Sequence, residues 1–354
     1  MQEPTLPRTQ NIQIETDMTS FLTTRLNAIK ALFPGLLISV LIAMAAQFIS
    51  EHYGAPSMLM ALLFGTTLNF LSEEGPCRAG IAFSARPLLQ FGVALLGMRI
   101  SFEMAAALGW PIVALVIGGV ITTILFGMSI AWLFGHGPRF AFLSAGSVAI
   151  CGASAAMAIS AILPHDERTE ERLVFTVVGV TLLSTIAMVV YPILAATIGF
   201  DAQFSGVFIG ATIHDVAQVV GAGFSISEET GDIATVVKLI RVAMLAPVIL
   251  VATIVIRRLG GKDSTGKRPA LVPTFVVGFV VLLTLNSLGV FSTAITAFAA
   301  ELSRWALLTA IAAVGLKTSL REVAHIGFPA ISLLVTETLF IGTITIGALL
   351  WMGG

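Results

Sequence analysis

The stretch Gly206–Gly223, which reads GVFIGATIHDVAQVVGAG, decides how the rest of the chain is interpreted. It is long enough to span a bilayer and consists mainly of small and apolar residues, but His214, Asp215 and Gln218 lie at its centre. A charged group at mid-membrane costs about 2.5 to 3.5 kcal/mol on insertion scales, so it needs polar partners or water. We therefore expect this stretch to form part of a functional site.

A helix over the middle of this stretch would bring its polar side chains together, since His214 and Gln218 are four residues apart and Asp215 and Gln218 three. We predict that His214 and Asp215 carry a coupling proton, because histidine titrates near neutral pH and an adjacent carboxylate can share its proton. Gln218 and the neighbouring Thr212 are predicted to contact a substrate. A buried structural hydrogen-bond network is the alternative.

Two cations follow in the next apolar segment, VVKLIRVAMLAPV at 236–248. Lys238 and Arg241 share one helical face, and we predict that they supply the positive charge that a bound dianion requires. Side chains that reach back to the lipid headgroups are the simpler alternative. Glu337, in the last apolar segment, is predicted to carry a proton or to pair with a basic residue.

The segment SAGSVAICGASAAMAIS at Ser144–Ser160 predicts a broken helix. Its glycines, among them Gly152, permit unwinding, and the freed amides together with the hydroxyls of Ser147 and Ser154 would bind an anion at the N-terminus of a half-helix. We assign Cys151 to the same substrate-binding segment. Tight packing of small residues against a neighbouring helix is the alternative.

The composition is that of an integral membrane protein. Hydrophobic residues make up 56% of the 354-residue chain and charged residues 11%, whereas soluble domains carry roughly 25% charged residues. The net charge of −1 argues against nucleic acid as a partner. Two cysteines imply neither a disulfide framework nor a metal site, and we expect no cofactor. The lipid bilayer is the expected surrounding, and the sequence leaves a homo-oligomer open.

Apolar segments of about 17 to 26 residues, the length that spans a bilayer, predict about eleven transmembrane helices. We expect an all-α polytopic protein with an N-terminal cytoplasmic tail at 1–32 and one transmembrane transporter domain at 33–354. The predicted helices lie approximately at 33–50, 55–71, 80–98, 109–134, 141–163, 173–198, 204–224, 233–256, 270–291, 299–316 and 328–351.

The loops predict an orientation. Lysine and arginine concentrate on the side of the N-terminus, above all in the run RRLGGKDSTGKR at 257–268. Because cytoplasmic loops carry such an excess, the N-terminus is predicted to lie inside and the C-terminus outside. With eleven crossing helices, this orientation places Arg168 and Arg172 outside.

An internal repeat relates the first four predicted helices to the last four. One block of residues recurs at a constant offset of 218: Arg86, Gly97, Arg99, Ser101, Gly109, Trp110 and Pro111 match Arg304, Gly315, Lys317, Ser319, Gly327, Phe328 and Pro329. One residue out of that register, the triplet at 67–69 recurs at 284–286.

The repeat predicts two copies of opposite orientation, at about 33–134 and 233–351. The copies are seven helices apart, and an odd number reverses their direction through the membrane. Inverted repeats with substrate bound at mid-membrane on broken helices are common in secondary transporters. The central segments, about 141–224, are then predicted to hold the site. Chance similarity among glycine-rich helices is the alternative.

Three segments also resemble a known family: SAGSVAICGASA at 144–155, GATIHDVAQVVGAG at 210–223 and KLIRVAMLAP at 238–247. They are similar to those of the YeiH-type bacterial inner-membrane proteins, which are described as sulfate exporters. The resemblance runs from about residue 33 to the C-terminus. It implies a multi-pass protein of the plasma membrane that transports sulfate or a related anion released in sulfonate degradation.

The sequence therefore predicts a secondary active transporter that exports or exchanges sulfate or a related small oxyanion, and not an enzyme. Cys151 and His214 have no recognisable third catalytic group, and no ATP-binding motif occurs. A cation/proton antiporter is the alternative, in which Asp215 and Glu337 bind the cation and Lys238 or Arg241 compensates helix ends. A passive channel or a receptor is a third hypothesis.

Overall fold

The computed structural model describes residues 8–53, 55–100, 103, 106, 108–164, 168–258, 273–318 and 328–353, and the secondary structure in these ranges is helical. This confirms the all-α prediction. The basic run beyond residue 258 and the repeat residues Ser101, Ser319 and Gly327 lie outside the described residues.

Seven helical stretches of the described chain are long and apolar enough to cross a membrane, and shorter apolar helices lie in the predicted segments between them. The protein is therefore a multi-pass membrane protein. The seven stretches are Lys30–Tyr53, Arg78–Leu96, Gly109–Phe134, Glu171–Ile198, Glu228–Ile256, Thr293–Lys317 and Ala330–Trp351.

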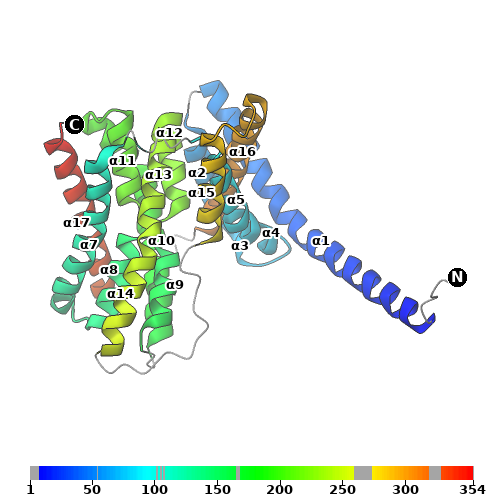
Figure 1. Cartoon of the computed structure of the whole chain (residues 1–354), viewed down its shortest axis with the longest axis horizontal. Helices are drawn as coiled ribbons and strands as arrows, with labels where there is room; N and C mark the ends of the chain where they lie inside the picture. The colour runs from blue at the N-terminus through cyan, green and yellow to red at the C-terminus, as the bar shows by residue number, and fades with distance from the viewer. Residues whose placement is uncertain are drawn as a thin grey trace.

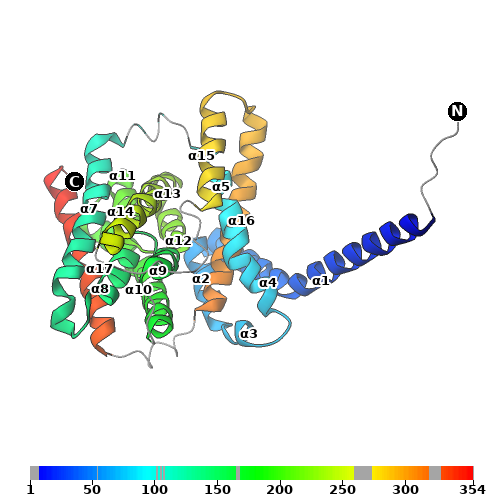
Figure 2. The ribbon, with the colours of Figure 1, turned by 60° about the horizontal axis from the view of Figure 1, so that its bottom comes forward.

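The helices form two bundles (Figures 1 and 2). The α16 bundle consists of α1 (Arg8–Tyr53), α2 (Ser57–Thr67), α3 (Phe70–Glu73), α4 (Arg78–Phe83), η1 (Ser84–Leu88), α5 (Leu89–Leu96), α15 (Thr274–Ser287) and α16 (Thr293–Lys317). The hairpin bundle consists of α7 (Gly109–Ile130), η2 (Ala131–Phe134), α8 (Pro138–Ala149), α9 (Ala153–Ile162), α10 (Thr169–Ile198), α11 (Ala202–Thr212), α12 (Val216–Ile226), α13 (Glu228–Ala243), α14 (Leu245–Arg258) and α17 (Phe328–Trp351).

From Arg8 onward, the predicted N-terminal tail is helical and continues into the first predicted span. Helix α1 is continuous from Arg8 to Tyr53, so the predicted tail and the first predicted span belong to one helix. Its first half extends away from the two bundles in Figure 1. The bundles themselves meet where α12 packs on α2 and α16.

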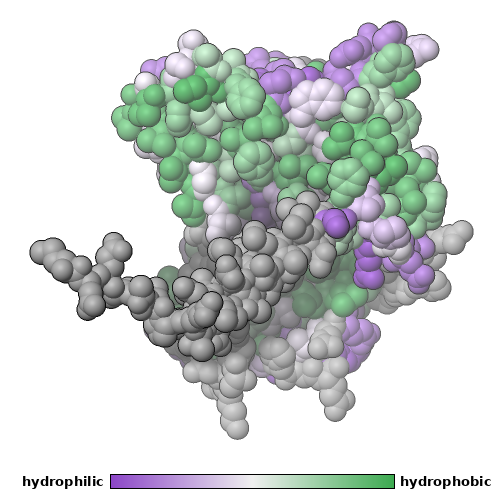
Figure 3. Space-filling view, turned by 90° about the vertical axis from the view of Figure 1, so that its right-hand side faces the viewer, coloured by the Kyte–Doolittle hydropathy of each residue, from purple (hydrophilic) through white to green (hydrophobic). Residues whose placement is uncertain are grey.

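The outer surface of the bundles suits a lipid environment. Large apolar side chains on several helices are exposed, for example Leu125 (61%), Ile193 (64%), Leu250 (60%) and Leu339 (62%). Figure 3 shows that apolar residues cover much of the coloured part of one face, whereas hydrophilic residues gather along its upper edge and again lower down on its right-hand side. Apolar patches of this extent are rare on soluble monomers and common on surfaces that contact membranes.

Helices α8 and α9 form a hairpin, which we call the first hairpin. A Cβ atom on Gly146 would lie 2.4 Å from Cδ1 of Ile159, although a continuous helix would separate these residues by about 20 Å. The chain before α8 and the start of α10 line one hollow, so both ends of the hairpin lie at the same end of the bundle. We call this the basic end, since it holds Arg139, Arg168 and Arg172.

Helices α11 and α12 form the second hairpin, which enters from the opposite end. Thr230, at the start of α13, donates a hydrogen bond from Oγ1 to the carbonyl of Ala202, where α11 begins (3.2 Å). A Cβ atom on Gly223, near the end of α12, would lie 2.8 Å from Cα of Gly231. Both ends of the hairpin therefore lie beside the start of α13. We call this the Glu228 end.

Local sequence explains where the hairpins begin and turn. Pro138 occupies the first turn of α8, where a missing N–H costs nothing. Asp201 caps α11 by accepting a hydrogen bond from the amide of Phe204 (2.7 Å). At the tip of the first hairpin, Gly152 has φ +61°, a conformation that L side chains rarely adopt. At the second tip, Ile213 and Asp215 are extended.

The break predicted in Ser144–Ser160 is therefore present, whereas the helix expected over the middle of Gly206–Gly223 is interrupted at Ile213–Asp215, and neither segment continues across the membrane. Half-helices of 10 to 12 residues are about 15 to 18 Å long, roughly half of the hydrocarbon core. Each segment enters, turns at mid-depth and returns. This difference places Arg168 and Arg172 on the same side as Arg139, not on the opposite side as the eleven-crossing topology predicted.

Two glycines at matching repeat positions make matching contacts. A Cβ atom on Gly97 would lie 2.3 Å from the carbonyl oxygen of Phe279, and one on Gly315 would lie 2.4 Å from the carbonyl oxygen of Leu62. Each glycine thus lets a helix of one sequence half approach the backbone of the other half. A side chain at either position would force the helices apart.

Two asparagines at matching repeat positions also cross-link helices. Asn69 Nδ2 donates to the carbonyl of Leu316 (2.7 Å), and Asn286 Nδ2 donates to the carbonyl of Ile100 (3.3 Å). These bonds join segments that are far apart in sequence but adjacent in the α16 bundle.

Candidate functional site

The tips of the two hairpins meet inside the hairpin bundle, next to α13. Each tip ends a half-helix, α8 or α11, whose last carbonyls have no donor within the helix. Lys238 on α13 donates from Nζ to the carbonyls of Ile150 (2.9 Å) and Ile213 (2.9 Å), one in each tip. The Lys238 side chain is fully buried. It therefore bridges the two hairpins.

Arg241, one turn later on α13, donates to four carbonyls at the same tips. Its Nε and Nη2 atoms donate to Ala149 (2.9 Å) and Val148 (2.8 Å) in the first hairpin. Its Nη1 atom donates to Ile213 (2.9 Å) and Gly210 (3.2 Å) in the second. Positive charge at a helix C-terminus offsets the negative end of the helix dipole. Compensation of helix ends, the alternative considered for Lys238 and Arg241, is the role that these contacts favour.

His214, at the second tip, bonds through both ring nitrogens and is fully buried. Nδ1 lies 3.2 Å from the carbonyl of Val148, which can only accept, so Nδ1 carries a proton. Nε2 lies 2.9 Å from the hydroxyl of Thr338 on α17. The same hydroxyl lies 2.7 Å from the carbonyl of Leu334.

The single hydroxyl proton of Thr338 can be donated in one direction at a time. If it is donated to Leu334, Nε2 of His214 must donate and the ring is an imidazolium. If it is donated to Nε2, the ring is neutral. The charge of His214 is thus linked to the orientation of the Thr338 hydroxyl, which is what a proton-carrying site requires.

Glu337 lies beside Thr338 on α17 and is fully buried. Its Oε1 atom accepts a hydrogen bond from Ser144 Oγ (2.9 Å), and Oε2 has no partner among the described residues. Gly127 on α7 makes room for the carboxyl group, since a Cβ atom there would lie 2.4 Å from Oε1. A buried carboxylate with an unpaired oxygen is costly, so this setting favours the neutral acid.

The hydrogen bonds of the two predicted proton carriers, His214 and Glu337, involve neighbouring residues on the same two helices and together form what we call the polar network. Ser144 and Val148 are one turn apart on α8, and Glu337 and Thr338 are adjacent on α17. The network connects α17 with the tips of both hairpins. Sequence reasoning selected His214 and Glu337 separately, but their connection through Thr338 was not foreseen because no spacing rule relates positions so far apart.

Comparison with known proteins gives the family. The family model described as "Conserved hypothetical protein 698" matches residues 34–334. Relatives named UPF0324 membrane protein TauZ, from Paracoccus denitrificans, and UPF0324 membrane protein RB0971, from Rhizobium meliloti, are 59% and 54% identical to this chain. The chain belongs to the UPF0324 membrane protein family.

The alignments extend over most of both partners. The Paracoccus relative aligns over 322 residues, which are 90% of this chain and 95% of its own, and the Rhizobium relative over 90% and 93%. A UPF0324 membrane protein of Caulobacter vibrioides is 36% identical over 86% of this chain and 65% of its own. Membership in the UPF0324 family is consistent with the expected resemblance to YeiH-type proteins.

The predicted substrate residues of this UPF0324 protein differ in accessibility. Ser147 and Thr212 are buried and donate their hydroxyl protons within their own helices, to the carbonyls of Leu143 (2.5 Å) and Phe208 (2.5 Å). Cys151 is also buried. Their places at the tips are those of packed small residues.

Four other predicted residues lie at or near the tips. Gly152 begins α9, and the next residue but one, Ser154, is exposed in the first turn of that helix. Asp215 is half-exposed, and its amide donates to Ser184 Oγ on α10 (3.0 Å). Gln218 is buried; its Nε2 lies 3.4 Å from Thr185 Oγ1, and its Oε1 has no partner among the described residues.

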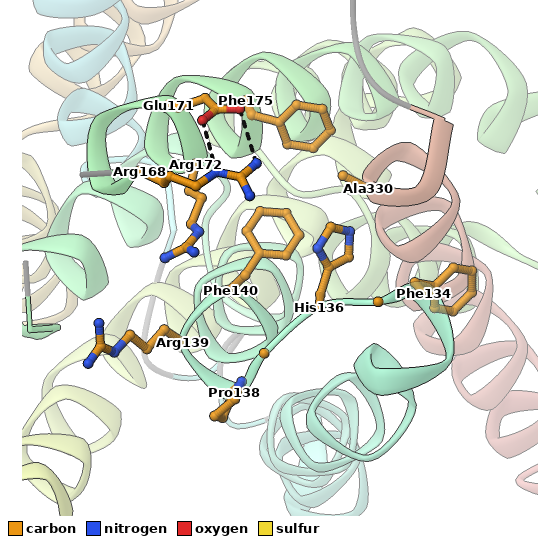
Figure 4. Close-up of a pocket in the computed structure, with 12 residues that line it drawn as sticks. Phe134, His136, Pro138, Arg139, Phe140, Arg168, Glu171, Arg172, Phe175 and Ala330 are labelled. Atoms are coloured by element: carbon orange, nitrogen blue, oxygen red, sulfur yellow. Dashed lines mark hydrogen bonds and ion pairs between the residues drawn. The ribbon is translucent and has the colours of Figure 1, made fainter. Parts of the chain in front are cut away.

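A hollow of about 620 Å³ at the basic end was not foreseen from the sequence. His136, Phe140 and Phe175 gather on one side of it, and Arg168 forms an ion pair with Glu171 at its rim (Figure 4). Burial, and then the charges of Arg168 and Arg172, lower the pKa of His136. Its ring is therefore neutral near pH 7. The hollow arises because the first hairpin returns to the end at which it enters.

An ion-pair cluster joins the two bundles at the Glu228 end. Arg99, which follows α5 in the α16 bundle, pairs with Asp232 on α13 (Nε to Oδ2, 2.9 Å) and with Glu228. Its guanidinium carbon lies 5.9 Å from the ring centre of Phe224. The Asp232 side chain is only 5% exposed. These contacts fasten the hairpin bundle to the α16 bundle at this end.

Proposed function

We propose that this UPF0324 protein is a secondary active transporter of a small oxyanion, with sulfate or a related anion as substrate. The observation that carries the proposal is the meeting of two opposed hairpins at mid-depth, next to a buried polar network. Discontinuous helices of this kind form the substrate and ion sites of secondary transporters. The half-helix N-termini of α9 and α12 also lie at the tips and carry partial positive charge.

Inverted repeats are part of the proposal. The matched contacts of Gly97 and Gly315, and those of Asn69 and Asn286, are the relations expected of two copies that pack on each other. The hairpins enter from opposite ends, as inverted elements do. By the positive-inside rule, the basic end faces the cytoplasm.

Proton coupling through His214 and Glu337 completes the mechanism. His214, in the tip of the second hairpin, contacts Val148 of the first hairpin and Thr338 on α17, so its charge can respond to hairpin movement. Glu337 offers an adjacent carboxyl group in the same network. Movement of the hairpin bundle against the α16 bundle would then expose the site to each side in turn.

Exchange in proteoliposomes tests the transport proposal. Vesicles that hold the full-length protein and unlabelled sulfate are expected to accumulate labelled sulfate from outside, with saturation and with dependence on pH. Protein-free vesicles are the control. If sulfate, sulfite, thiosulfate and organic sulfonates all fail to exchange under every gradient, the anion proposal is wrong.

A histidine variant tests the proton role. His214→Gln is expected to keep sulfate exchange but to lose its dependence on pH, because the glutamine amide can bond to Val148 without titrating. His136→Gln, which changes the histidine of the surface hollow, is the matched control and should keep the pH profile. A wild-type pH profile in His214→Gln would exclude His214 as the proton carrier.

A cation/proton antiporter is the second candidate, and two observations favour it. Buried acceptor atoms without a partner among the described residues, Gln218 Oε1 and Glu337 Oε2, are groups that a cation could contact. Lys238 and Arg241 bond to helix ends, as that mechanism requires. Sodium-driven proton movement, followed with a pH-sensitive dye in the same vesicles and without anion exchange, would decide for this candidate.

A further inference from the structure

An arginine lies halfway along one membrane-spanning segment of the α16 bundle. Helices α4, η1 and α5 together form the 19-residue stretch Arg78–Leu96, and Arg86 is close to its centre. The surrounding turn, Ser84–Leu88, is a π-helix that contains Pro87. Such turns are rare and occur frequently at functional sites. From the sequence, Arg86 was singled out only as a member of the internal repeat.

Arg86 is exposed and forms no hydrogen bond or ion pair with any residue that the structure describes. A charged side chain at this depth cannot face lipid cheaply; such residues face the bundle interior or a water-filled cavity. An exposed guanidinium at this depth therefore requires water or a polar ligand. Its five N–H donors remain available to a ligand.

Arg304, the repeat counterpart of Arg86, has guanidinium donors that bond to other side chains. Arg304, on α16, bonds to both carboxylate oxygens of Glu301 (2.8 and 3.2 Å) and to Oε1 of Gln47 (3.1 Å). Its guanidinium carbon also lies 5.4 Å from the ring centre of Trp305. The repeat thus preserves the arginine but not its partners. Of the two arginines, Arg86 is the one whose donors bond to no described residue.

One charged group of the hairpin bundle that lies within electrostatic range of Arg86 is Asp215, whose carboxyl group lies at the tip of the second hairpin. Asp215 is half-exposed, and Ser154 is exposed in the first turn of α9 at the other tip. The accessible polar groups at mid-depth therefore lie on both sides of the boundary between the bundles.

We propose that Arg86 is the cation that binds the transported oxyanion, and that the binding site, which we call the cleft, lies between the α16 bundle and the hairpin tips. This inference rests on the proposed transport of an oxyanion and assigns the binding role to Arg86 in place of Lys238 and Arg241. A planar guanidinium can bond to two oxygens of a sulfate-like anion at once. Asp215 is the competing anion for Arg86 when no substrate is bound.

Binding of radiolabelled sulfate to the purified full-length protein tests the assignment. Arg86→Gln should weaken binding by about tenfold or more, as expected for the loss of charge-assisted hydrogen bonds. Arg86→Lys should be intermediate, because it keeps the charge but loses the planar fork. Asp215→Asn should bind sulfate about two- to fivefold more tightly, since the competing charge is removed.

The matched control is Arg304→Gln, which removes the equivalent arginine of the other repeat copy and should leave sulfate affinity unchanged. Wild-type affinity in an Arg86→Gln protein with an unchanged size-exclusion profile would overturn the inference while leaving the transport proposal intact. If the wild-type protein neither binds nor exchanges any oxyanion of the panel, the transport proposal itself fails, and the inference with it.

A thiol variant keeps the test decisive if Arg86→Gln does not fold. In a Cys77→Ser background, the thiol introduced by Arg86→Cys should react with a charged methanethiosulfonate, because the position faces water. Sulfate should slow that reaction by occupying the cleft. A thiol that does not react, or that reacts equally fast with and without saturating sulfate, would overturn the inference.

Discussion

The hairpin tips and the cleft between the bundles both place positive charge at mid-membrane, but they differ in what they offer a ligand. Lys238 and Arg241 are buried and donate to carbonyls of both tips. Arg86 is exposed and has no such partner among the described residues. From this comparison we infer that a candidate binding residue is marked by unsatisfied donors, and not by charge and depth alone.

The difference has a physical origin in the half-helices. Helices α8 and α11 end inside the protein, where water cannot satisfy their last carbonyls. Lys238 and Arg241 provide the missing donors and offset the negative helix ends. The α4–η1–α5 segment has no such end at Arg86, so no residue that the structure describes bonds to its donors.

The largest expected effect is a loss of stability when a buried cation that donates to backbone carbonyls is removed. Arg241→Met removes a donor from four buried carbonyls. Ile213 and Val148 keep their bonds to Lys238 and His214, whereas Ala149 and Gly210 lose the side-chain donor, and each unsatisfied group costs about 1 to 3 kcal/mol. We expect the free energy of unfolding to fall by about 3 kcal/mol or more, measured by thermal unfolding of the purified protein followed by size exclusion.

The control for this prediction is Arg258→Met, which changes an exposed arginine at the end of α14 and should alter stability by less than about 0.5 kcal/mol. An Arg241→Met protein of normal stability that no longer binds sulfate would show instead that Arg241 belongs to the binding site, and the contrast with Arg86 would disappear.

A moderate effect on the ratio of closed to open states is expected where ion pairs join the hairpin bundle to the α16 bundle. Arg99→Gln removes the ion pairs with Glu228 and Asp232, which are partly buried and join the two bundles. A loss of about 1 kcal/mol would shift the ratio of closed to open states at the Glu228 end about fivefold. Spin-label distances between α5 and α13 should record a larger open population.

The control for the fastening is Arg168→Gln. Its ion pair with Glu171 is exposed and lies within one helix, so removing it should leave the inter-bundle distances unchanged. Equal distance distributions in Arg99→Gln and the wild type would mean that packing of α12 on α2 and α16 holds the bundles together without the ion pairs.

The smallest expected effect distinguishes exposed from buried hydroxyls. Ser154→Ala should weaken sulfate binding about two- to tenfold, the equivalent of one hydrogen bond of about 0.5 to 1.5 kcal/mol. Ser147→Ala should not change the affinity, since that hydroxyl is buried and bonds to Leu143. Sulfate titrations of the two variants check the prediction, and an affinity loss in Ser147→Ala alone would move the ligand from the cleft to the tips.

Much of the fold could be predicted from local sequence. The length and apolarity of the segments indicated the membrane-embedded helices, and glycine with small residues around Gly152 indicated a break. The reversal of direction could not be predicted, because a small apolar segment has the same pattern whether its second half continues or returns. Only contacts such as that of Gly146 with Ile159 distinguish the two.

The sequence by itself determined the class of protein and the depth of its polar groups, because both depend on composition and on position within an apolar segment. It singled out His214, Asp215, Lys238, Arg241 and Glu337 for that reason. The tertiary structure alone decided what each group contacts. Lys238 bonds to Ile150, 88 residues away. Whether a buried cation is satisfied depends on such distant backbone groups, which no local pattern records.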